Sequence, residues 1–316
     1  MQANFISAAD AFGSWREGVL SGMPPLFYPV AESGPLSRVE IGPELITLIG
    51  GAPGAGKSAL IMQMVVDALR LSKSLRAVVC SIEMPPKVLL DRQLSRLSGI
   101  ALDVIRHRRM EAIHDERIVR GLATLEAVIT RLCFVRPPYD LENIQATVDA
   151  FVSLDSSRDL LIVCDYIQRI APRGYSGDKR GSVDTTMGFL RHFADRSAAV
   201  LVVSSLARQK SSKGGASYDR ESLNLASFKE SGELEFGADD AFILTPDETP
   251  GLVELKHLKS RHGERRDVKL RFDGRIQRFT APVSESDEDQ NELASRLSES
   301  WGNKVSKGGL THDGCS

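Results

Sequence analysis

A phosphate-binding signature near the N-terminus constrains the fold of this chain more than any other feature. Residues 51–58 read Gly-Ala-Pro-Gly-Ala-Gly-Lys-Ser and match the pattern G-x-x-x-x-G-K-S/T at every position. The apolar, partly β-branched run 46–49 precedes the signature, as a buried strand would. Apolar residues recur after it at helical spacing, namely Leu60, Ile61, Met64 and Ala68. This context favours a phosphate-binding loop over the alternative, a Gly-rich turn that happens to precede a helix.

Each part of the loop has an expected place in a nucleotide site. Glycines let backbone N–H groups curve around phosphate oxygens, and the helix N-terminus adds partial positive charge. We expect Lys57 to reach the β- and γ-phosphates and the Ser58 hydroxyl to coordinate Mg²⁺. The predicted cofactors are ATP and Mg²⁺, although such a loop reads phosphates and leaves the base undecided. The residues predicted to bind them in this loop are Gly51, Ala52, Pro53, Gly54, Ala55, Gly56, Lys57 and Ser58.

Composition limits the kinds of protein that this chain can be. With 316 residues, 42% hydrophobic and 26% charged, it can bury one sizeable core, so we expect one α/β domain with short appendages. The net charge is −2, so any nucleic-acid contact has to come from local basic loops. No membrane-length apolar run or targeting pattern is present, and the cysteines show no paired spacing. These features predict a cytoplasmic protein with reduced thiols and no membrane partner.

Apolar strand-like runs alternate with helical patterns, which predicts an α/β P-loop NTPase fold: a mostly parallel twisted sheet flanked by helices. The predicted strands are 46–49, 77–82, 132–135, 160–164, 200–203, 241–244, 252–258, 268–272 and 276–279. The last three are short and close together, and Asp273-Gly274 is a two-residue turn signal, so we expect a C-terminal antiparallel hairpin extension. Three parts are predicted: a segment with a short helix (1–42), the ATPase domain (43–280) and a polar, disordered tail (281–316).

Two of the predicted strands end in a carboxylate. Asp165 follows the run 160–164, and we expect it to hold Mg²⁺ because the carboxyl ends of parallel strands line the ligand crevice. Glu83 follows the run 77–82 and is a candidate base that polarises the attacking water. The alternatives are a helix cap or turn acid for Asp165 and a surface acid for Glu83. For Glu83, spacing alone does not choose between them.

The order of six segments resembles the C-terminal motor domain of DnaB-type replicative helicases, a RecA-like group of superfamily 4. The segments are GAPGAGKS, SIEMPPKVLLDRQLS, LLIVCDYIQRI, VLVVSSLARQ, SFKESGELEFGADDAFIL and LKSRHG, collinear over roughly residues 43–280. The resemblance implies a RecA-like fold, phosphate and metal roles for Lys57, Ser58 and Asp165, and catalysis by Glu83. It also implies that Lys259 and Arg261 reach the neighbouring subunit's nucleotide as a finger pair, in a ring that is expected to be a hexamer.

The chain departs from the family pattern in three places. Ser205 stands where the family has the glutamine that senses the γ-phosphate, and Lys229 replaces an arginine. No counterpart of the N-terminal collar domain of the replicative enzymes is expected, and the helix expected near Ala8–Val19 resembles the family's linker helix. Because Ser205 has a shorter reach than glutamine, the coupling between hydrolysis and DNA movement is expected to differ or to depend on another residue.

Two basic loops are the predicted contacts with single-stranded DNA. Their place after the metal-binding strand and after the next strand matches the DNA-binding loops of RecA-like motors, as the resemblance implies. Such loops suit tracking of a phosphate backbone, although composition alone favours the alternative, because charge-rich loops are usually solvated. The predicted contacts are Arg169, Arg173, Lys179 and Arg180 in the first loop, and Arg208, Lys210 and Lys213 in the second.

These inferences combine into a prediction of a ring-forming, ATP-dependent DNA helicase that translocates on single-stranded DNA. Two alternatives stay open. One is a DNA-stimulated ATPase that loads or remodels DNA–protein complexes without unwinding, and the other is a nucleotide-gated assembly protein. The sequence indicates neither the loader or replication partner nor the polarity of movement, and it does not distinguish a chromosomal, plasmid or phage origin.

Overall fold

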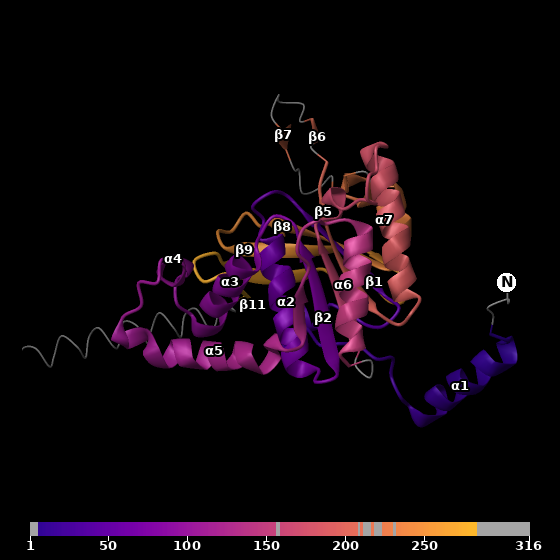
Figure 1. Cartoon of the computed structure of the whole chain (residues 1–316), viewed down its shortest axis with the longest axis horizontal. Helices are drawn as coiled ribbons and strands as arrows, with labels where there is room; N and C mark the ends of the chain where they lie inside the picture. Colours follow the sequence, from indigo (N-terminus) through magenta and orange to yellow (C-terminus); the bar gives the residue numbers. More distant parts are fainter. Residues whose placement is uncertain are drawn as a thin grey trace, which may run out of the picture.

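A nine-stranded sheet organises the computed structural model, which describes residues 6–155, 159–207, 209–210, 216–217, 223–229 and 232–282. The strand order is β11-β10-β9-β8-β1-β5-β4-β2-β3 (Figure 1). The strands that run parallel are β1 (Ile46–Gly51), β2 (Leu75–Ser81), β3 (Leu132–Phe134), β4 (Asp159–Asp165), β5 (Ala199–Ser205) and β8 (Asp240–Pro246). Antiparallel pairing begins between β8 and β9 and continues through β9 (Leu252–Ser260), β10 (Val268–Asp273) and β11 (Arg278–Thr280).

Every predicted strand is present, and the antiparallel C-terminal extension is confirmed. Strands β1 and β2 are buried along their whole length, because helices cover the sheet on both faces. The predicted two-residue turn at Asp273-Gly274 is wrong. The turn spans 274–277 and β11 starts at Arg278, because the Gln277 side chain donates to the Gly274 carbonyl and the Asp273 carboxylate accepts from the Arg275 N–H. Side chains therefore stabilise a longer turn than the dipeptide signal indicates.

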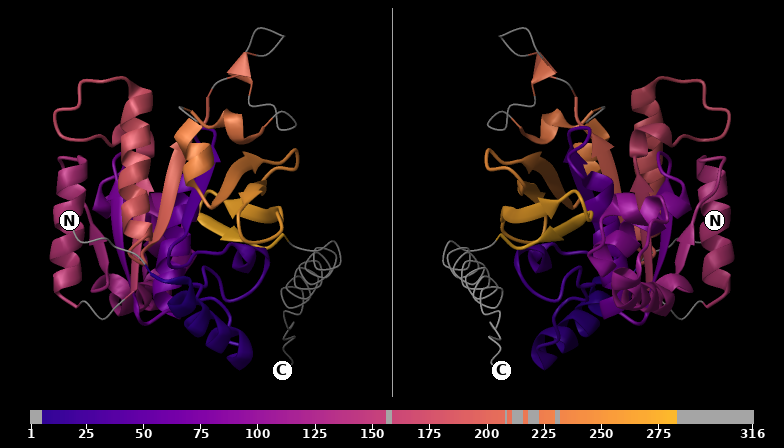
Figure 2. Two further views of the ribbon diagram at one scale, coloured as in Figure 1. Left: turned by 90° about the vertical axis from the view of Figure 1, so that its right-hand side faces the viewer. Right: turned by 90° about the vertical axis from the view of Figure 1, so that its left-hand side faces the viewer.

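Helices cover the two faces of the sheet in two groups (Figures 1 and 2). One face packs against α2 (Lys57–Leu71), α3 (Pro86–Ser98) and α5 (Asp115–Ile129). The other packs against α6 (Leu141–Ser153) and α7 (Lys179–Ala194). Shorter elements are α4 (Leu102–Arg106), α8 (Gly232–Gly237) and the small antiparallel pair β6 (Gln209–Lys210) and β7 (Ala216–Ser217). Alternate residues of each central strand thus contribute to separate cores.

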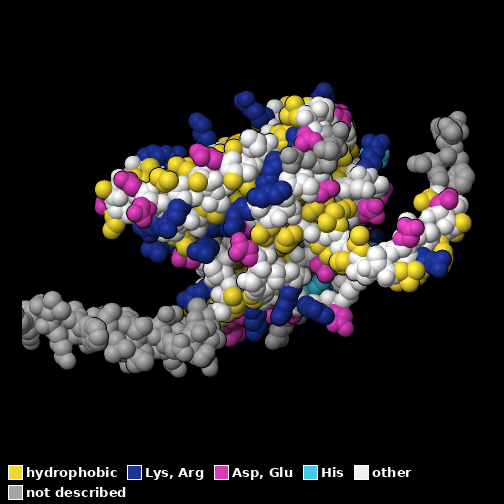
Figure 3. All heavy atoms as spheres, turned by 90° about the horizontal axis from the view of Figure 1, so that it is seen from below, with side chains coloured by type: hydrophobic (Ala, Val, Ile, Leu, Met, Phe, Trp, Pro, Cys, Tyr) yellow, Lys and Arg dark blue, Asp and Glu magenta, His cyan; other side chains and the backbone are white. Residues whose placement is uncertain are grey.

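The N-terminal residues divide into an exposed helix and a packed segment. Helix α1 (Ala8–Ser21) confirms the helix expected there, starts at the Ser7 cap and buries none of its residues. It stands away from the body of the molecule (Figures 1 and 3), and its apolar side chains Phe12, Trp15 and Val19 are more than half exposed. The segment after it contributes buried side chains to the core, namely Tyr28, Val30, Leu36, Val39 and Ile41.

Other expectations concern the cysteines and the tail. Cys80 and Cys164 are buried, whereas Cys133 is half-buried. Burial raises the pKa of the Cys80 thiol to about 12. Cys315 and the predicted tail beyond residue 282 lie outside the described residues. Within the described ranges, no helix combines the length and apolar character that crossing a membrane needs.

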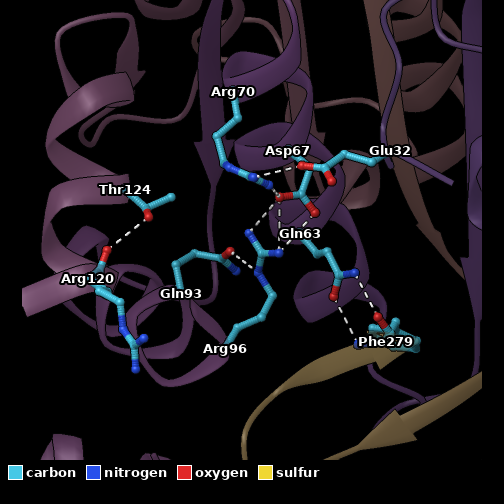
Figure 4. Close-up of polar contacts among 9 residues, drawn as sticks. All are labelled: Glu32, Gln63, Asp67, Arg70, Gln93, Arg96, Arg120, Thr124 and Phe279. Carbon is cyan, nitrogen blue, oxygen red and sulfur yellow. Dashed lines mark hydrogen bonds and ion pairs between the residues drawn. The ribbon is translucent and has the colours of Figure 1, made fainter. Parts of the chain in front are cut away.

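A buried polar network fastens the helix after the phosphate loop to its surroundings (Figure 4). The Asp67 carboxylate on α2 binds the Arg96 guanidinium of α3 at 2.9 Å, and both side chains are less than a tenth exposed. Arg70 pairs with the same carboxylate and with the exposed Glu32. One turn earlier, the Gln63 amide exchanges two hydrogen bonds of 2.9 Å with the backbone of Phe279 on β11. The network therefore connects α2 to α3 and to the C-terminal hairpin.

We predict that Asp67→Ala lowers the free energy of unfolding by about 3–5 kcal/mol, because it leaves the buried Arg96 guanidinium without its counter-charge. Urea unfolding followed by circular dichroism measures this loss. Glu32→Ala is the matched control, since it removes an exposed partner of the same network and should cost at most about 1 kcal/mol. Equal losses in the two variants would contradict the prediction that the buried Asp67–Arg96 pair contributes more to the free energy of unfolding than Glu32 does.

Candidate functional site

The phosphate loop joins β1 to α2 in the predicted strand–loop–helix arrangement. Gly54 and Gly56 adopt φ values of 81° and 92°, which disfavour residues with a Cβ. A Cβ at Gly56 would also lie 3.1 Å from the Phe279 ring and 3.2 Å from the Phe272 ring. Gly56 is therefore required twice, by its backbone conformation and by the close approach of the C-terminal hairpin, whereas Gly54 is required by its backbone conformation alone.

Lys57 and Ser58 begin α2 and face the loop. The Lys57 ammonium donates to the carbonyls of Gly51 and Ala52, at 2.8 Å and 2.9 Å. Burial lowers the pKa of Lys57, while the carboxylates of Asp165 and Glu83 act in the opposite direction. The lysine is thus held inside the loop, where it can exchange backbone carbonyls for phosphate oxygens.

A cleft of about 560 Å³ brings together four of the predicted catalytic and cofactor-binding side chains. Lys57, Ser58, Glu83 and Asp165 all line it, although they come from three separate segments of the chain. Ser205, the residue that departs from the family pattern, lines the same cleft. The remaining lining residues are Pro53, Gly54, Gly56, Met84, Arg92, Tyr166, Phe272 and Gln277.

Asp165 is the buried acid of this cleft, with a residue exposure of 7%. Burial raises the pKa of its carboxyl group, whereas the hydrogen bond with Ser58 and the charge of Lys57 lower it. A carboxylate beside a hydroxyl offers the hard oxygen ligands that Mg²⁺ prefers. No cluster of three or more His, Cys, Asp or Glu side chains suited to a metal occurs in the described ranges. The donor set therefore fits Mg²⁺ completed by phosphate oxygens and water, not a cage made of protein alone.

Sequence reasoning missed several residues of the cleft wall, among them Arg92 and Phe272. Arg92 on α3 lines the cleft, and its buried Nε has no hydrogen-bond partner among the residues that the structure describes. Burial lowers the pKa of Arg92, while the charge of Asp165 raises it. Phe272 stacks on Phe279 with ring centroids 4.3 Å apart and adds an aromatic surface beside Gly56. Helical spacing from Leu89 could have indicated that Arg92 faces inward, but no local signal brings β10 against the phosphate loop.

Gln168 is a further residue that sequence reasoning missed. Its side-chain amide donates to the Ser204 hydroxyl at 2.7 Å and to the Lys229 carbonyl at 3.1 Å. Its carbonyl oxygen accepts from the Ser205 N–H at 3.3 Å. One amide thereby fastens the ends of β4 and β5 to the segment that contains Lys229.

The predicted finger residues lie far from the chain's own phosphate loop. Lys259 pairs with Ala241 near the start of β8, whereas the loop follows the other end of β1. Five residue steps of β1, about 17 Å at roughly 3.3 Å each, separate the two edges of the sheet. Lys259 donates to the Glu235 and Ala238 carbonyls around the end of α8, both at 2.7 Å. The fold does not bring Lys259 and Arg261 to the nucleotide cleft of their own subunit.

The predicted DNA-contacting residues of the first loop all lie within the described part of the chain. Arg169 ends a 3₁₀ turn after β4, and Lys179 and Arg180 begin α7. Arg173 is engaged within the subunit, since it pairs with Asp140 at 3.0 Å. In the second loop, Arg208, Lys213 and the side chain of Lys210 lie outside the described residues.

A mostly parallel sheet with a phosphate loop after β1 and a buried acid at the end of β4, which β5 separates from β1, defines a P-loop nucleotide-binding domain. The family model described as DnaB-like helicase C-terminal domain matches residues 41–281. The chain therefore belongs to this family, whose members are the ATPase motor domains of replicative helicases. Their general cofactors are a nucleotide and Mg²⁺. No curated protein matches the chain.

Solved structures support the fold. One of them, titled as the ATPase domain of another protein, has a TM-score of 0.76 and 18% identity, and the match covers 89% of this chain and 100% of that one. A second is titled "The Structure Of A DnaB-Like Replicative Helicase And Its Interactions With Primase". It has a TM-score of 0.73 and 18% identity, and the match covers 89% of this chain and 68% of that one. The predicted RecA-like fold and the resemblance are confirmed.

We predict that Asp165→Asn makes the protein more stable without Mg²⁺ while removing its response to Mg²⁺-ATP. A carboxyl group whose pKa is raised on folding opposes folding in its charged form, so wild-type stability falls as the pH rises through that pKa. The neutral amide removes this dependence and should add about 1 kcal/mol at pH 7. Thermal unfolding in EDTA and in Mg²⁺-ATP measures both effects. A lower midpoint for the variant in EDTA would contradict the prediction.

Proposed function

We propose that this chain is the subunit of a ring-forming, ATP-dependent helicase that translocates on single-stranded DNA. The observation that carries the proposal is the division of the predicted catalytic residues between two edges of the sheet. Lys57, Ser58, Glu83 and Asp165 line the nucleotide cleft, and Lys259 and Arg261 lie at the opposite edge. A subunit with this arrangement has an incomplete catalytic site, which a neighbouring copy can complete.

Within the cleft, the roles follow from position and chemistry. Lys57 neutralises the β- and γ-phosphates after leaving the Gly51 and Ala52 carbonyls. Ser58 and Asp165 hold Mg²⁺, which supplies charge neutralisation at the phosphates when bound. Glu83 orients the attacking water and accepts its proton. The guanidinium of Arg261, from the adjacent subunit, matches the charge that spreads over the γ-phosphate oxygens in the transition state.

Helix α1 supports assembly into a ring, which we propose to be hexameric. Its exposed apolar side chains need a partner surface, and α3, α4 and α5 line an apolar cleft of about 420 Å³. The resemblance to the family's linker helix implies that α1 of one subunit packs on the next. The apolar residues that line this cleft are Leu90, Leu94, Ile105, Met110, Ile118, Leu122, Leu125 and Ile129.

For DNA, we propose that the loops after β4 and β5 track the phosphate backbone. Arg169, Lys179 and Arg180 offer charge from the first loop, and Arg208, Lys210 and Lys213 from the second. We also propose that Arg173 releases Asp140 when it contacts DNA, since both are now paired. The protein is proposed to act in the cytoplasm.

Ser205 favours a second candidate function, a DNA-stimulated ATPase that remodels DNA–protein complexes without unwinding. Its short side chain lines the cleft where the family uses a longer glutamine. A strand-displacement assay separates the two functions, because only the helicase releases a labelled strand from a forked duplex. The proposed nucleotide-gated assembly function is less well supported, since it requires neither Glu83 in the cleft nor Arg261.

We predict that single-stranded DNA stimulates steady-state ATP hydrolysis several-fold. Glu83→Gln should lower kcat by about 100-fold or more, because the amide cannot accept the proton of the attacking water. A coupled phosphate-release assay with and without DNA measures both effects. Wild-type turnover that is indifferent to DNA would contradict the motor proposal, and undiminished turnover of Glu83→Gln would contradict the role of the carboxylate.

We predict that two inactive variants regain partial activity when mixed. Lys57→Ala removes the phosphate contact but keeps the finger, and Arg261→Ala does the reverse and should lower kcat about 10³-fold while nucleotide still binds. Mixed rings contain Arg261→Ala sites that face an intact finger, so turnover should exceed the sum of the separate proteins. Titration of one variant into the other measures this excess turnover. A strictly additive result would contradict action across the subunit interface.

A further inference from the structure

Asp239 lies between the predicted finger and the centre of the sheet, directly before β8. Its side chain is 2% exposed and makes contacts in three directions. One carboxylate oxygen accepts from the Ile46 N–H at 2.8 Å and from the Arg191 guanidinium at 3.0 Å. The other pairs with the Arg261 guanidinium at 2.6 Å. A single buried carboxylate therefore joins β1, α7 and the finger arginine.

The backbone of Asp239 is fixed as firmly as its side chain. Its N–H donates to the Ile46 carbonyl at 2.8 Å, and its carbonyl accepts from the Arg261 N–H at 3.0 Å. Both hydrogen bonds continue the pairing of β8 with its neighbours on either side. The carboxylate consequently has a defined position relative to the edge of the sheet from which Arg261 projects.

Arg261 depends on this carboxylate more than Arg191 does. Arg191 also donates to the carbonyls of Glu44 and Gly237, so it keeps two anchors without Asp239. Arg261 has one other side-chain contact described, a hydrogen bond of 3.2 Å to the Phe236 carbonyl, and its side chain is 46% exposed. A guanidinium has five N–H donors, so these two contacts leave donors free toward solvent.

The local charge balance also rests on Asp239. Lys259, Arg261 and Arg191 gather around it, with Glu235 as a second acid. Burial lowers the pKa of Lys259, Arg261 and Arg191 lower it further, and Asp239 and Glu235 raise it. Loss of the Asp239 charge would leave three cations to repel one another, with the half-exposed Arg261 side chain the most free to move.

We propose that Asp239 is the positioning residue of the finger: its carboxylate holds the Arg261 guanidinium in the orientation in which a neighbouring subunit's γ-phosphate meets it. This inference rests on the proposed action of Arg261 across the interface. Asp239 is not among the residues that line the nucleotide cleft of its own subunit, so the proposed role is exerted through Arg261. A guanidinium that is already oriented loses less conformational freedom when it engages the phosphate. Orientation of Arg261 by Asp239 should therefore raise kcat.

The test uses mixed rings, in which finger and nucleotide site belong to different proteins. The acceptor is Arg261→Ala, which has an intact phosphate loop, and the donor is Lys57→Ala, which has an intact finger. Asp239→Asn is then added to the donor alone, because asparagine still accepts the Ile46 N–H but lacks the charge. Asp240→Asn in the donor is the matched control, since this adjacent buried acid pairs with His257 and not with Arg261.

We expect the Asp239→Asn donor to give a rescued kcat about ten-fold lower than the plain donor, with the KM for ATP unchanged. The KM belongs to the acceptor's phosphate loop, which the change does not touch. The Asp240→Asn donor should rescue as well as the plain donor. Equal rescue by the Asp239→Asn donor, or a changed KM, would overturn the inference. Failure of the plain donor to rescue would overturn the action across the interface itself, and the inference with it.

A second measurement separates positioning from a general loss of structure. Within one chain, Asp239→Asn is combined with Arg261→Ala and compared with Arg261→Ala alone. If Asp239 acts through Arg261, the double variant keeps the residual turnover of the single variant. A further drop in turnover would show that Asp239 supports the fold of the nucleotide site and would overturn the positioning role.

Discussion

The parallel pairing of the central strands is the constraint on which the rest of this structure depends. Because β1, β2, β4 and β5 run in the same direction, their carboxyl ends meet at one edge of the sheet. The register places Gly51 beside Ser205, and Ser81 beside Asp165. Segments that are far apart in the chain thereby line one cleft, and each strand satisfies its backbone hydrogen bonds in doing so.

The same sheet has a second functional edge because its direction changes after β8. The antiparallel strand β9 returns along β8 and delivers Lys259 and Arg261 to the edge where the parallel strands begin. A wholly parallel sheet would place the end of that strand beside the phosphate loop of the same subunit. The antiparallel extension therefore separates the two halves of the proposed catalytic site, which is the geometry that a ring of identical subunits requires.

Buried charged side chains occur in several places in this domain, and their roles differ. The ion pair between Asp67 and Arg96 joins two helices of the scaffold. In the cleft, burial raises the pKa of Asp165 and lowers that of Arg92, so desolvation disfavours the charged form of each side chain. Charged side chains that suit binding of a charged ligand therefore lower the stability of the unliganded domain. Asp239 combines the two uses, since it is paired as a scaffold residue and faces the proposed finger.

The sequence by itself determined the strands, the phosphate loop and the acids that follow two of the strands. These are local patterns, carried by apolar runs and by glycines with special backbone angles, and neighbouring residues specify them. Its dipeptide signal failed at Asp273-Gly274, because side-chain hydrogen bonds of Asp273 and Gln277 favour a longer turn. The roles assigned to the site residues stay predictions.

Only the tertiary structure decided which distant side chains complete the site. Phe279 meets Gln63 across 216 positions of the chain, and Asp239 meets Ile46 across 193. No periodicity or motif within one sequence encodes such a meeting, because it depends on strand order, on the antiparallel return of β9 and on the packing of β10 and β11 over α2. The positions of Arg92, Phe272 and Asp239 therefore follow from the folded sheet and not from their neighbours in the chain.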